Sequence, residues 1–312
     1  MKKGVVLRST GSSYSIESEG NLYYCKLKGK MRLENIKSTN PVAVGDNVIF
    51  EVDNTSKKYE GKIIEIGYRK NYIVRKSVNL SKQTHIIASN IDQAILMITI
   101  EDPVTTTNFI DRFLVSANAY NIDVVLLFNK LDIYSKESMI RYHDLSSIYE
   151  NIGYECLGLS VVNDDLHKLK VLMKDKINVI SGHSGVGKTS LINKLQPGLN
   201  LATNEISKQF KQGKHTTTYS QMFDLDFGSA IIDTPGIKGF GLVEINNLEL
   251  GNFFPEFLKF KQKCKYNDCM HLNEPGCQIK IALNKKLISE SRYNSYLSML
   301  KYDDYSYRVK KI

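Results

Sequence analysis

The amino-acid sequence predicts a multidomain α/β protein with an N-terminal β-barrel, a doubly wound central sheet and a helical C-terminal domain. Short runs of alternating apolar residues fill residues 1–72, strands and helices alternate through residues 73–242, and residues 243–312 have a helical, aromatic-rich texture. A chain of 312 residues is long enough for two or three domains, each with its own core. We therefore predict three domains with these boundaries.

The first domain contains five short β-like runs separated by Gly, Ser and Asn. These runs occupy residues 4–7, 14–16, 22–27, 47–52 and 61–66. Five strands in about 70 residues favour an OB-type barrel, a fold that binds oligonucleotides. The pattern also allows an SH3-like barrel, or a β cap that only packs on the core.

The second domain has the pattern of a doubly wound sheet. Continuous apolar runs are typical of parallel strands buried on both faces. We predict strands at residues 95–98, 124–128, 154–160, 177–180, 222–227 and 230–232, and helices at residues 109–120, 164–174 and 190–195.

A glycine-rich phosphate-binding loop joins a predicted strand to a predicted helix in this second domain. Its backbone N–H groups would surround phosphates, the Lys188 ammonium would reach the β- and γ-phosphates, and the Thr189 hydroxyl would bind Mg²⁺. The predicted nucleotide contacts in this loop are Gly182, His183, Ser184, Gly185, Val186, Gly187, Lys188, Thr189 and Ser190.

A guanine-recognition motif precedes the phosphate loop in the chain. It consists of Asn129, Lys130, Leu131 and Asp132, directly after a predicted strand. The Asp132 carboxylate can accept from two adjacent N–H donors that guanine has and adenine lacks, which gives strong discrimination. The backbone at Ser160, after the next strand, would shape the base pocket. Because ordinary GTPases carry the phosphate loop first, the order here predicts a circularly permuted P-loop GTPase.

Two further segments complete the predicted GTP site. Asp233 would hold a magnesium-bound water, and the Gly236 N–H would meet the γ-phosphate. In the threonine-rich segment upstream, Thr217 would bind Mg²⁺ when the γ-phosphate is present, with Thr216 as a close rival. His215 could position the attacking water, although a solvated loop histidine is an equally good interpretation.

No glutamine follows Gly236 at the place where Ras-like enzymes orient the attacking water. We therefore expect slow intrinsic hydrolysis that awaits a partner.

Three cysteines and a histidine lie close together in the third domain. Cys264, Cys269, His271 and Cys277 form the complete ligand set of one structural zinc ion. The alternative, four residues of an ordinary core, fits their polar, turn-rich surroundings poorly.

The positive charge of the chain is concentrated at its two ends. Lys and Arg exceed Asp and Glu by five in the first predicted domain and by four in the third, whereas they balance in the second, for a net charge of +9. This distribution indicates a polyanionic partner such as RNA, contacted by both flanks. A lysine-rich surface that only aids solubility explains the charge equally well.

Nothing in the sequence suggests export or membrane insertion. No stretch approaches the roughly 18 apolar residues of a membrane helix, and the first residues lack the apolar run of a secretory signal. We expect a cytoplasmic protein, in which five cysteines, an odd number, argue for metal binding before disulfides.

Together these motifs closely resemble the family of ribosome small subunit-dependent GTPases called RsgA, YjeQ or YloQ. The resemblance rests on NKLD ahead of GHSGVGKTS, on GKHTTT and DTPGI, and on the Cys/His run, and it covers essentially the whole chain. It implies a late-acting assembly factor that binds ribosomal RNA, is stimulated by the small ribosomal subunit, and leaves after GTP hydrolysis. It also implies that residues 182–190 and 129–132 contact GTP and that the four Cys and His residues are zinc ligands. We expect a monomer.

Two other functions are compatible with the same motifs. One is a permuted GTPase of large-subunit assembly, which the zinc segment and the barrel disfavour. The other is a GTP-gated RNA-binding module with little hydrolysis, which the missing glutamine allows.

Overall fold

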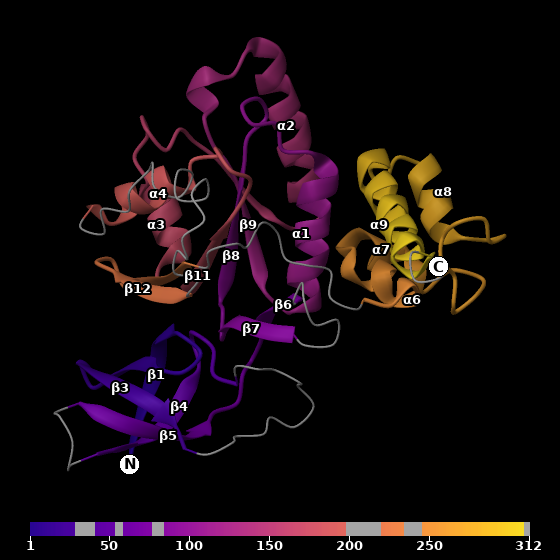
Figure 1. Ribbon diagram of the computed structural model, residues 1–312. Helices are drawn as coiled ribbons and strands as arrows, with labels where there is room; N and C mark the ends of the chain where they lie inside the picture. Colours follow the sequence, from indigo (N-terminus) through magenta and orange to yellow (C-terminus); the bar gives the residue numbers. More distant parts are fainter. Residues whose placement is uncertain (29–40, 54–58, 77–83, 198–219, 234–244, 309–312) are drawn as a thin grey trace.

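The computed structural model describes residues 1–28, 41–53, 59–76, 84–197, 220–233 and 245–308. An N-terminal barrel, a central α/β core and a C-terminal group of helices follow one another in space as they do in the chain (Figure 1). The multidomain fold class predicted from the sequence is confirmed.

The N-terminal barrel has five strands in the hydrogen-bonded order β1-β2-β3-β5-β4, and a β1–β4 pairing closes it. Strands β3 and β5 are parallel, and the other neighbours are antiparallel. Tyr14, Ile16 and Phe50 fill the interior. All five predicted runs are strands of this OB-type barrel: β1 Lys2–Ser9, β2 Tyr14–Ser18, β3 Asn21–Leu27, β4 Asn47–Val52 and β5 Glu60–Ile66.

The core sheet has the strand order β10-β9-β8-β11-β13-β12, parallel except for the last pair. Its six strands match the six predicted runs: β8 Gln93–Ile98, β9 Asp123–Phe128, β10 Glu155–Gly158, β11 Ile177–Ser181, β12 Gln221–Leu225 and β13 Ser229–Asp233. Because the guanine motif follows β9 and the phosphate loop follows β11, the motifs occur in the permuted order that the sequence predicted.

Helices cover both faces of the core sheet (Figure 1). Alternate residues of β8 point to opposite faces, so that Leu96 packs in the cluster under α1 and α2, whereas Met97 packs in the cluster under α3 and α4. The helices are α1 Thr107–Ala119, α2 Lys136–Asn151, α3 His167–Met173 and α4 Lys188–Leu195. This arrangement is the predicted doubly wound sheet.

Two helices differ from the sequence prediction. Helix α2 was not predicted, and α3 begins three residues later than predicted. The reason for the late start is that the Asp164 carboxylate accepts a hydrogen bond from the Ser160 N–H at 2.6 Å, and the Asp164 N–H donates to the Ser160 carbonyl. This acidic residue therefore closes a turn instead of starting the helix.

A buried polar junction connects the barrel with the core. Asp46 is fully buried, pairs with Arg69 and accepts a hydrogen bond from the Ser89 hydroxyl at 2.6 Å. Ser89 ends β7 (Thr84–Ser89), which pairs with β6 (Tyr72–Lys76) in a two-stranded sheet that the sequence did not predict. The predicted boundary at residue 72 stays a prediction.

The C-terminal helices pack against α1 of the core. They are α6 Asn247–Leu250, the short 3₁₀ helix η4 Gly251–Phe253, α7 Pro255–Lys261, α8 Gln278–Asn284 and α9 Glu290–Arg308. Within the described part of the chain, none of the helices has the length and apolar character that crossing a membrane requires.

Candidate nucleotide site and metal centre

The phosphate loop joins β11 to α4 and is shaped by three glycines with positive φ. The φ angles are +146° at Gly182, +88° at Gly185 and +103° at Gly187, a region that residues with a Cβ rarely adopt. A Cβ at Gly182 would lie 2.6 Å from the Met97 carbonyl oxygen of β8. The glycines therefore let the backbone turn tightly at the edge of the sheet.

The Lys188 side chain folds back over this loop. Its ammonium donates hydrogen bonds to the carbonyl oxygens of Gly182, at 2.7 Å, and His183, at 2.5 Å. Partial burial lowers the pKa of Lys188 from its ordinary value. The ammonium is thus held inside the loop whose backbone is predicted to surround the phosphates.

The other loop residues divide between the interior and the surface. Val186 is fully buried, whereas Ser184, Gly185 and Ser190 are exposed. Thr189 lies in the first turn of α4 and is half-buried.

The His183 imidazole contacts α1 on the outer side of the phosphate loop. Its ring centroid is 3.8 Å from that of Phe109, with the ring planes at 30°. Burial, and to a smaller extent the charge of Lys188, lowers the pKa of His183 below its ordinary value. The imidazole is therefore neutral at pH 7.

Asn129 connects the guanine motif with the phosphate loop. Its side-chain amide donates to the Val186 carbonyl at 2.8 Å, and its side-chain oxygen accepts from the Val161 N–H at 2.9 Å. Asn129 is buried, so both bonds are shielded from water. A single side chain thus ties the predicted guanine loop, the predicted phosphate loop and the loop after β10 together.

The rest of the guanine motif forms a tight turn. Lys130 has a φ of +67°, and its ammonium donates to the Asp102 carbonyl at 2.5 Å. Leu131 begins the short 3₁₀ helix η1 (Leu131–Ile133), and its N–H donates to the Leu159 carbonyl at 3.4 Å. Asp132 is exposed, and its carboxylate makes no hydrogen bond or ion pair with any residue that the structure describes. Both carboxylate oxygens are free to accept from a ligand.

Ser160 lies where the sequence predicted it, beside the guanine motif. It is 3% exposed, and its hydroxyl accepts a hydrogen bond from the Asn163 N–H at 3.3 Å. Since its neighbour Val161 donates to Asn129, this loop is fixed directly to the motif.

One residue of the site was missed in the sequence analysis. The Tyr134 hydroxyl donates to the Asn129 carbonyl and accepts from the Ile100 N–H, both at 2.8 Å. Burial raises the pKa of Tyr134 to about 12, so the hydroxyl stays protonated. No sequence pattern marks such a residue, because its role depends on the loop after β8.

Four of the predicted site residues have no described side-chain geometry. Thr217, His215 and Gly236 lie outside the described residues. Asp233 is the last residue of β13, whose partner β11 leads directly into the phosphate loop. Its main chain therefore lies at the same edge of the sheet as the phosphate loop.

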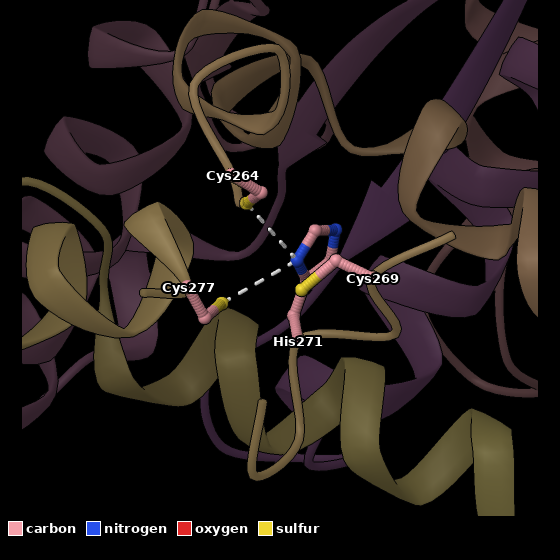
Figure 2. A group of neighbouring side chains, drawn as sticks. All are labelled: Cys264, Cys269, His271 and Cys277. Carbon is pink, nitrogen blue, oxygen red and sulfur yellow. Dashed lines mark hydrogen bonds between the residues drawn. The ribbon is translucent and has the colours of Figure 1, made fainter. Parts of the chain in front are cut away.

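The C-terminal domain holds a compact group of potential metal ligands (Figure 2). One donor atom from each of Cys264, Cys269, His271 and Cys277 lies within 4.8 Å of the others. The His271 Nδ1 is 3.8 Å from the Cys264 Sγ and 3.5 Å from the Cys277 Sγ. These are the four residues that the sequence predicted, and together they could hold a metal ion.

Local hydrogen bonds fix the positions of these donors. The Gln278 N–H points to the Cys264 Sγ at 3.4 Å, and the Tyr293 hydroxyl donates to the His271 carbonyl at 2.6 Å. Burial lowers the pKa of His271, which favours the neutral imidazole that metals bind. Burial also raises the pKa of Cys269 to about 12 in the metal-free chain. A cation is therefore what would stabilise its thiolate.

Comparison with known proteins identifies the family of this chain. The sequence profile of the RsgA GTPase matches residues 66–243, and that of the RsgA N-terminal domain matches residues 3–59. The chain belongs to the RsgA GTPase family. This membership confirms the family resemblance predicted from the motifs, and it makes the chain a GTP hydrolase.

Relatives within the family align over nearly the whole chain. The small ribosomal subunit biogenesis GTPase RsgA of Flavobacterium johnsoniae is 54% identical over 308 residues, which are 98% of this chain and 95% of the relative. The protein of the same name from Christiangramia forsetii is 53% identical over 309 residues, 98% of each chain.

Two solved structures of family members have the same fold. YjeQ from Thermotoga maritima superposes with a TM-score of 0.77 at 34% identity, covering 96% of this chain and 97% of that one. YloQ, described as a circularly permuted GTPase, superposes with a TM-score of 0.75 at 27% identity, covering 96% of this chain and 94% of that one. The fold is therefore shared over 96% of this chain.

Proposed function

We propose that this GTPase acts in late maturation of the small ribosomal subunit, that it binds ribosomal RNA, and that contact with the subunit stimulates its hydrolysis of GTP. The observation that carries the nucleotide part is the hydrogen bond between the Asn129 amide and the Val186 carbonyl. It supports a single guanine-nucleotide site made by two loops in permuted order. The relatives' name, small ribosomal subunit biogenesis GTPase, supports the choice of partner.

In this site the base and the phosphates have separate partners. The unpaired, exposed Asp132 carboxylate accepts from guanine, while Asn129 and the loop at Ser160 hold the recognition loop in place. Lys188 exchanges its contacts with the Gly182 and His183 carbonyls for the β- and γ-phosphates. Charge stabilisation by this ammonium and by the backbone N–H groups is the main contribution to catalysis.

Magnesium and the hydrolytic water belong to the same proposal. The Thr189 hydroxyl in the first turn of α4, Asp233 at the end of β13 and Thr217 would hold Mg²⁺. The Gly236 N–H would contact the γ-phosphate, and His215 would orient water when the partner is bound. Mg²⁺ would supply charge neutralisation between the phosphates.

The metal we propose for the C-terminal domain is one structural zinc ion. Three thiolates and one imidazole are a closed zinc ligand set. In a tetrahedral site with ordinary zinc bond lengths, a sulfur and a nitrogen ligand are about 3.6 Å apart. The two sulfur–nitrogen separations at His271, 3.5 and 3.8 Å, fit this value. Such an ion stabilises the fold of the domain and takes no part in hydrolysis.

The RNA-binding surfaces we propose are the two flanking domains. Both carry an excess of positive charge, whereas the nucleotide-binding core is neutral. Phosphate contacts by Lys and Arg provide most of the affinity in such interactions. The GTP form would bind the subunit, and hydrolysis would release it. We propose a cytoplasmic monomer.

The test is GTP turnover with and without purified ribosomal subunits of each size. We expect a strong increase with isolated small subunits and little with large ones. Equal stimulation by large subunits would overturn the partner, and no stimulation by either would favour a GTP-gated RNA-binding module. The Lys188→Ala variant is the control, because it removes the ammonium without changing the flanking domains.

A further inference from the structure

The phosphate loop has two side-chain anchors, one on each side. Val186 is buried in the apolar cluster below α3 and α4. On the opposite side, the His183 imidazole stacks on Phe109 of α1 at 3.8 Å. Three glycines with positive φ lie between and beside these anchors, and they add no contacts of their own to hold the loop. The shape of the loop therefore depends on what holds Val186 and His183.

The main chain of His183 links the Phe109–His183 stack to the phosphate site. The carbonyl of this residue is one of the two acceptors of the Lys188 ammonium, at 2.5 Å. A shift of the His183 ring moves its peptide group, and with it the acceptor of the phosphate-binding lysine. Phe109 belongs to α1, and its ring contact with His183 joins this helix to the loop.

Phe109 lies in the first turn of α1. The Thr106 hydroxyl caps this helix by accepting from the Phe109 N–H at 3.3 Å. Two residues after Phe109, Asp111 is fully buried and accepts from the Tyr149 hydroxyl of α2 at 2.7 Å. The cap thus stabilises the first turn of α1, and the buried carboxylate ties this end of the helix to α2.

The C-terminal domain also forms hydrogen bonds with the start of α1. Arg292 of α9 is 1% exposed and donates to Asp111 at 2.6 Å and to Glu256 of α7 at 2.7 Å. The Asn108 amide adds a hydrogen bond to the Ser298 hydroxyl at 3.2 Å. Both contacts flank Phe109 in the sequence of α1. The platform under His183 is therefore built jointly by the core and the C-terminal domain.

We propose that Phe109 is a positioning residue of the nucleotide site, which holds the phosphate loop in its phosphate-binding shape by stacking on His183. This inference rests on the proposed nucleotide site. Phe109 acts through His183 and touches no substrate. Its effect should fall on the phosphates that the loop surrounds and should spare the base, which the loops after β9 and β10 bind.

The test compares GDP and GMP affinity in the full-length chain by calorimetry, well below the unfolding midpoint. Phe109→Leu removes the ring but keeps an apolar side chain. Aromatic pairs contribute energies that correspond to about three- to tenfold in affinity. We expect GDP to bind about three- to tenfold more weakly and GMP to bind within about twofold of the unaltered chain. Phe109→Tyr keeps the ring and should restore GDP affinity.

A double substitution tests whether Phe109 acts through His183. If Phe109 affects GDP affinity through its stack on His183, the variant with both Phe109→Leu and His183→Gln should lose no more GDP affinity than either single variant. If the two losses of GDP affinity instead multiply in the double variant, Phe109 acts independently of His183. That result would overturn the proposal. Tyr24→Leu, an exposed aromatic residue of the barrel, is the matched control and should leave both affinities unchanged.

Different results would contradict the proposed nucleotide site and the positioning role of Phe109. If the unaltered chain binds GDP no more tightly than ADP, the proposed nucleotide site is wrong. If it binds GDP as expected but Phe109→Leu leaves GDP affinity unchanged, or weakens GDP and GMP equally, the site stands and the positioning role is wrong.

Discussion

The side-chain amide of Asn129 donates a hydrogen bond to the main-chain carbonyl of Val186 at 2.8 Å, across 57 positions of the sequence. Asn129 directly follows β9 and begins the guanine motif, and Val186 belongs to the phosphate loop. A bond between two parallel-strand ends places both loops at one edge of the sheet, where ligands of such folds bind. Reversing the order of the motifs in the chain has not separated them in space.

Gly187→Ala should disrupt this contact. A Cβ at Gly187 would lie 2.6 Å from the Asn129 amide nitrogen, and the φ of +103° is strained for alanine. We expect nucleotide affinity, measured by calorimetry with GDP, to fall by at least about tenfold, since a buried hydrogen bond is broken and its donor is left unpaired.

Gly153→Ala is the matched control for this change. Gly153 has a φ of +102°, but a Cβ there would meet open space. Its substitution therefore measures the cost of backbone strain alone, which we expect to be about 1 kcal/mol in the free energy of unfolding. If both variants bound GDP equally well, the close approach at Asn129 would have no role in binding.

Tyr134→Phe should loosen the guanine motif without removing any predicted nucleotide contact. The variant loses the hydroxyl that joins the Asn129 carbonyl to the Ile100 N–H, and it leaves that N–H without its acceptor. We expect a loss of about 1–3 kcal/mol in the free energy of unfolding. We also expect a severalfold rise in the dissociation constants of both GDP and guanosine, because the base loop is affected.

The control for Tyr134→Phe is Tyr68→Phe, because Tyr68 is 88% exposed. Unfolding by urea and calorimetric titration would be measured on both variants. A Tyr134→Phe variant that matches the unaltered chain in both measurements would contradict the bracing role.

The sequence was sufficient for those features that depend on local patterns. The glycines at 182, 185 and 187 must adopt positive φ for the loop to form, so their spacing in the sequence is enough to mark the loop. Likewise, the apolar run of β8 is buried on both faces of the sheet. Such patterns predicted the strands of the barrel and of the core sheet, the two nucleotide loops and the four potential metal ligands.

Features that depend on contacts between distant segments were not predictable in this way. Tyr134 and Phe109 act on loops far away in the chain, and nothing in their neighbouring residues indicates this. The acidic start predicted for α3 was wrong because Asp164 has a stronger local partner in the Ser160 N–H. The strands β6 and β7 are short, and residues of both pack into the apolar core together with residues of distant segments.

Asp132→Asn should change which base the site prefers. The carboxylate offers only acceptors to the two N–H donors of guanine, whereas an amide offers one acceptor and one donor. Xanthine, with a carbonyl in place of the exocyclic amino group, matches the amide. We expect GDP affinity to fall by at least about tenfold and xanthosine diphosphate affinity to rise, both measured by competition with a fluorescent nucleotide.

Asp144→Asn, on the outer part of α2, is a suitable control for this exchange. Its preference for GDP over xanthosine diphosphate should equal that of the unaltered chain. If the Asp132→Asn variant kept the preference for GDP over xanthosine diphosphate, the guanine base would not bind at Asp132.

Removing the metal should unfold the C-terminal domain while guanine binding persists. Structural zinc ions provide about 10–16 kcal/mol of apparent binding energy in small domains, which is as large as the stability of a whole domain. We expect chelation, or Cys264→Ser, to abolish the zinc content and the hydrogen-exchange protection of α8 and α9.

The nucleotide loops follow β9 and β11 of the core, so they should survive this change. Because α9 supports α1, we expect GDP affinity to fall, but by no more than in Phe109→Leu. Cys156→Ser is the matched control, since this thiol donates to main-chain carbonyls of the core and lies outside the ligand group. Complete loss of GDP binding on chelation would show that the core cannot hold its nucleotide loops without the C-terminal domain.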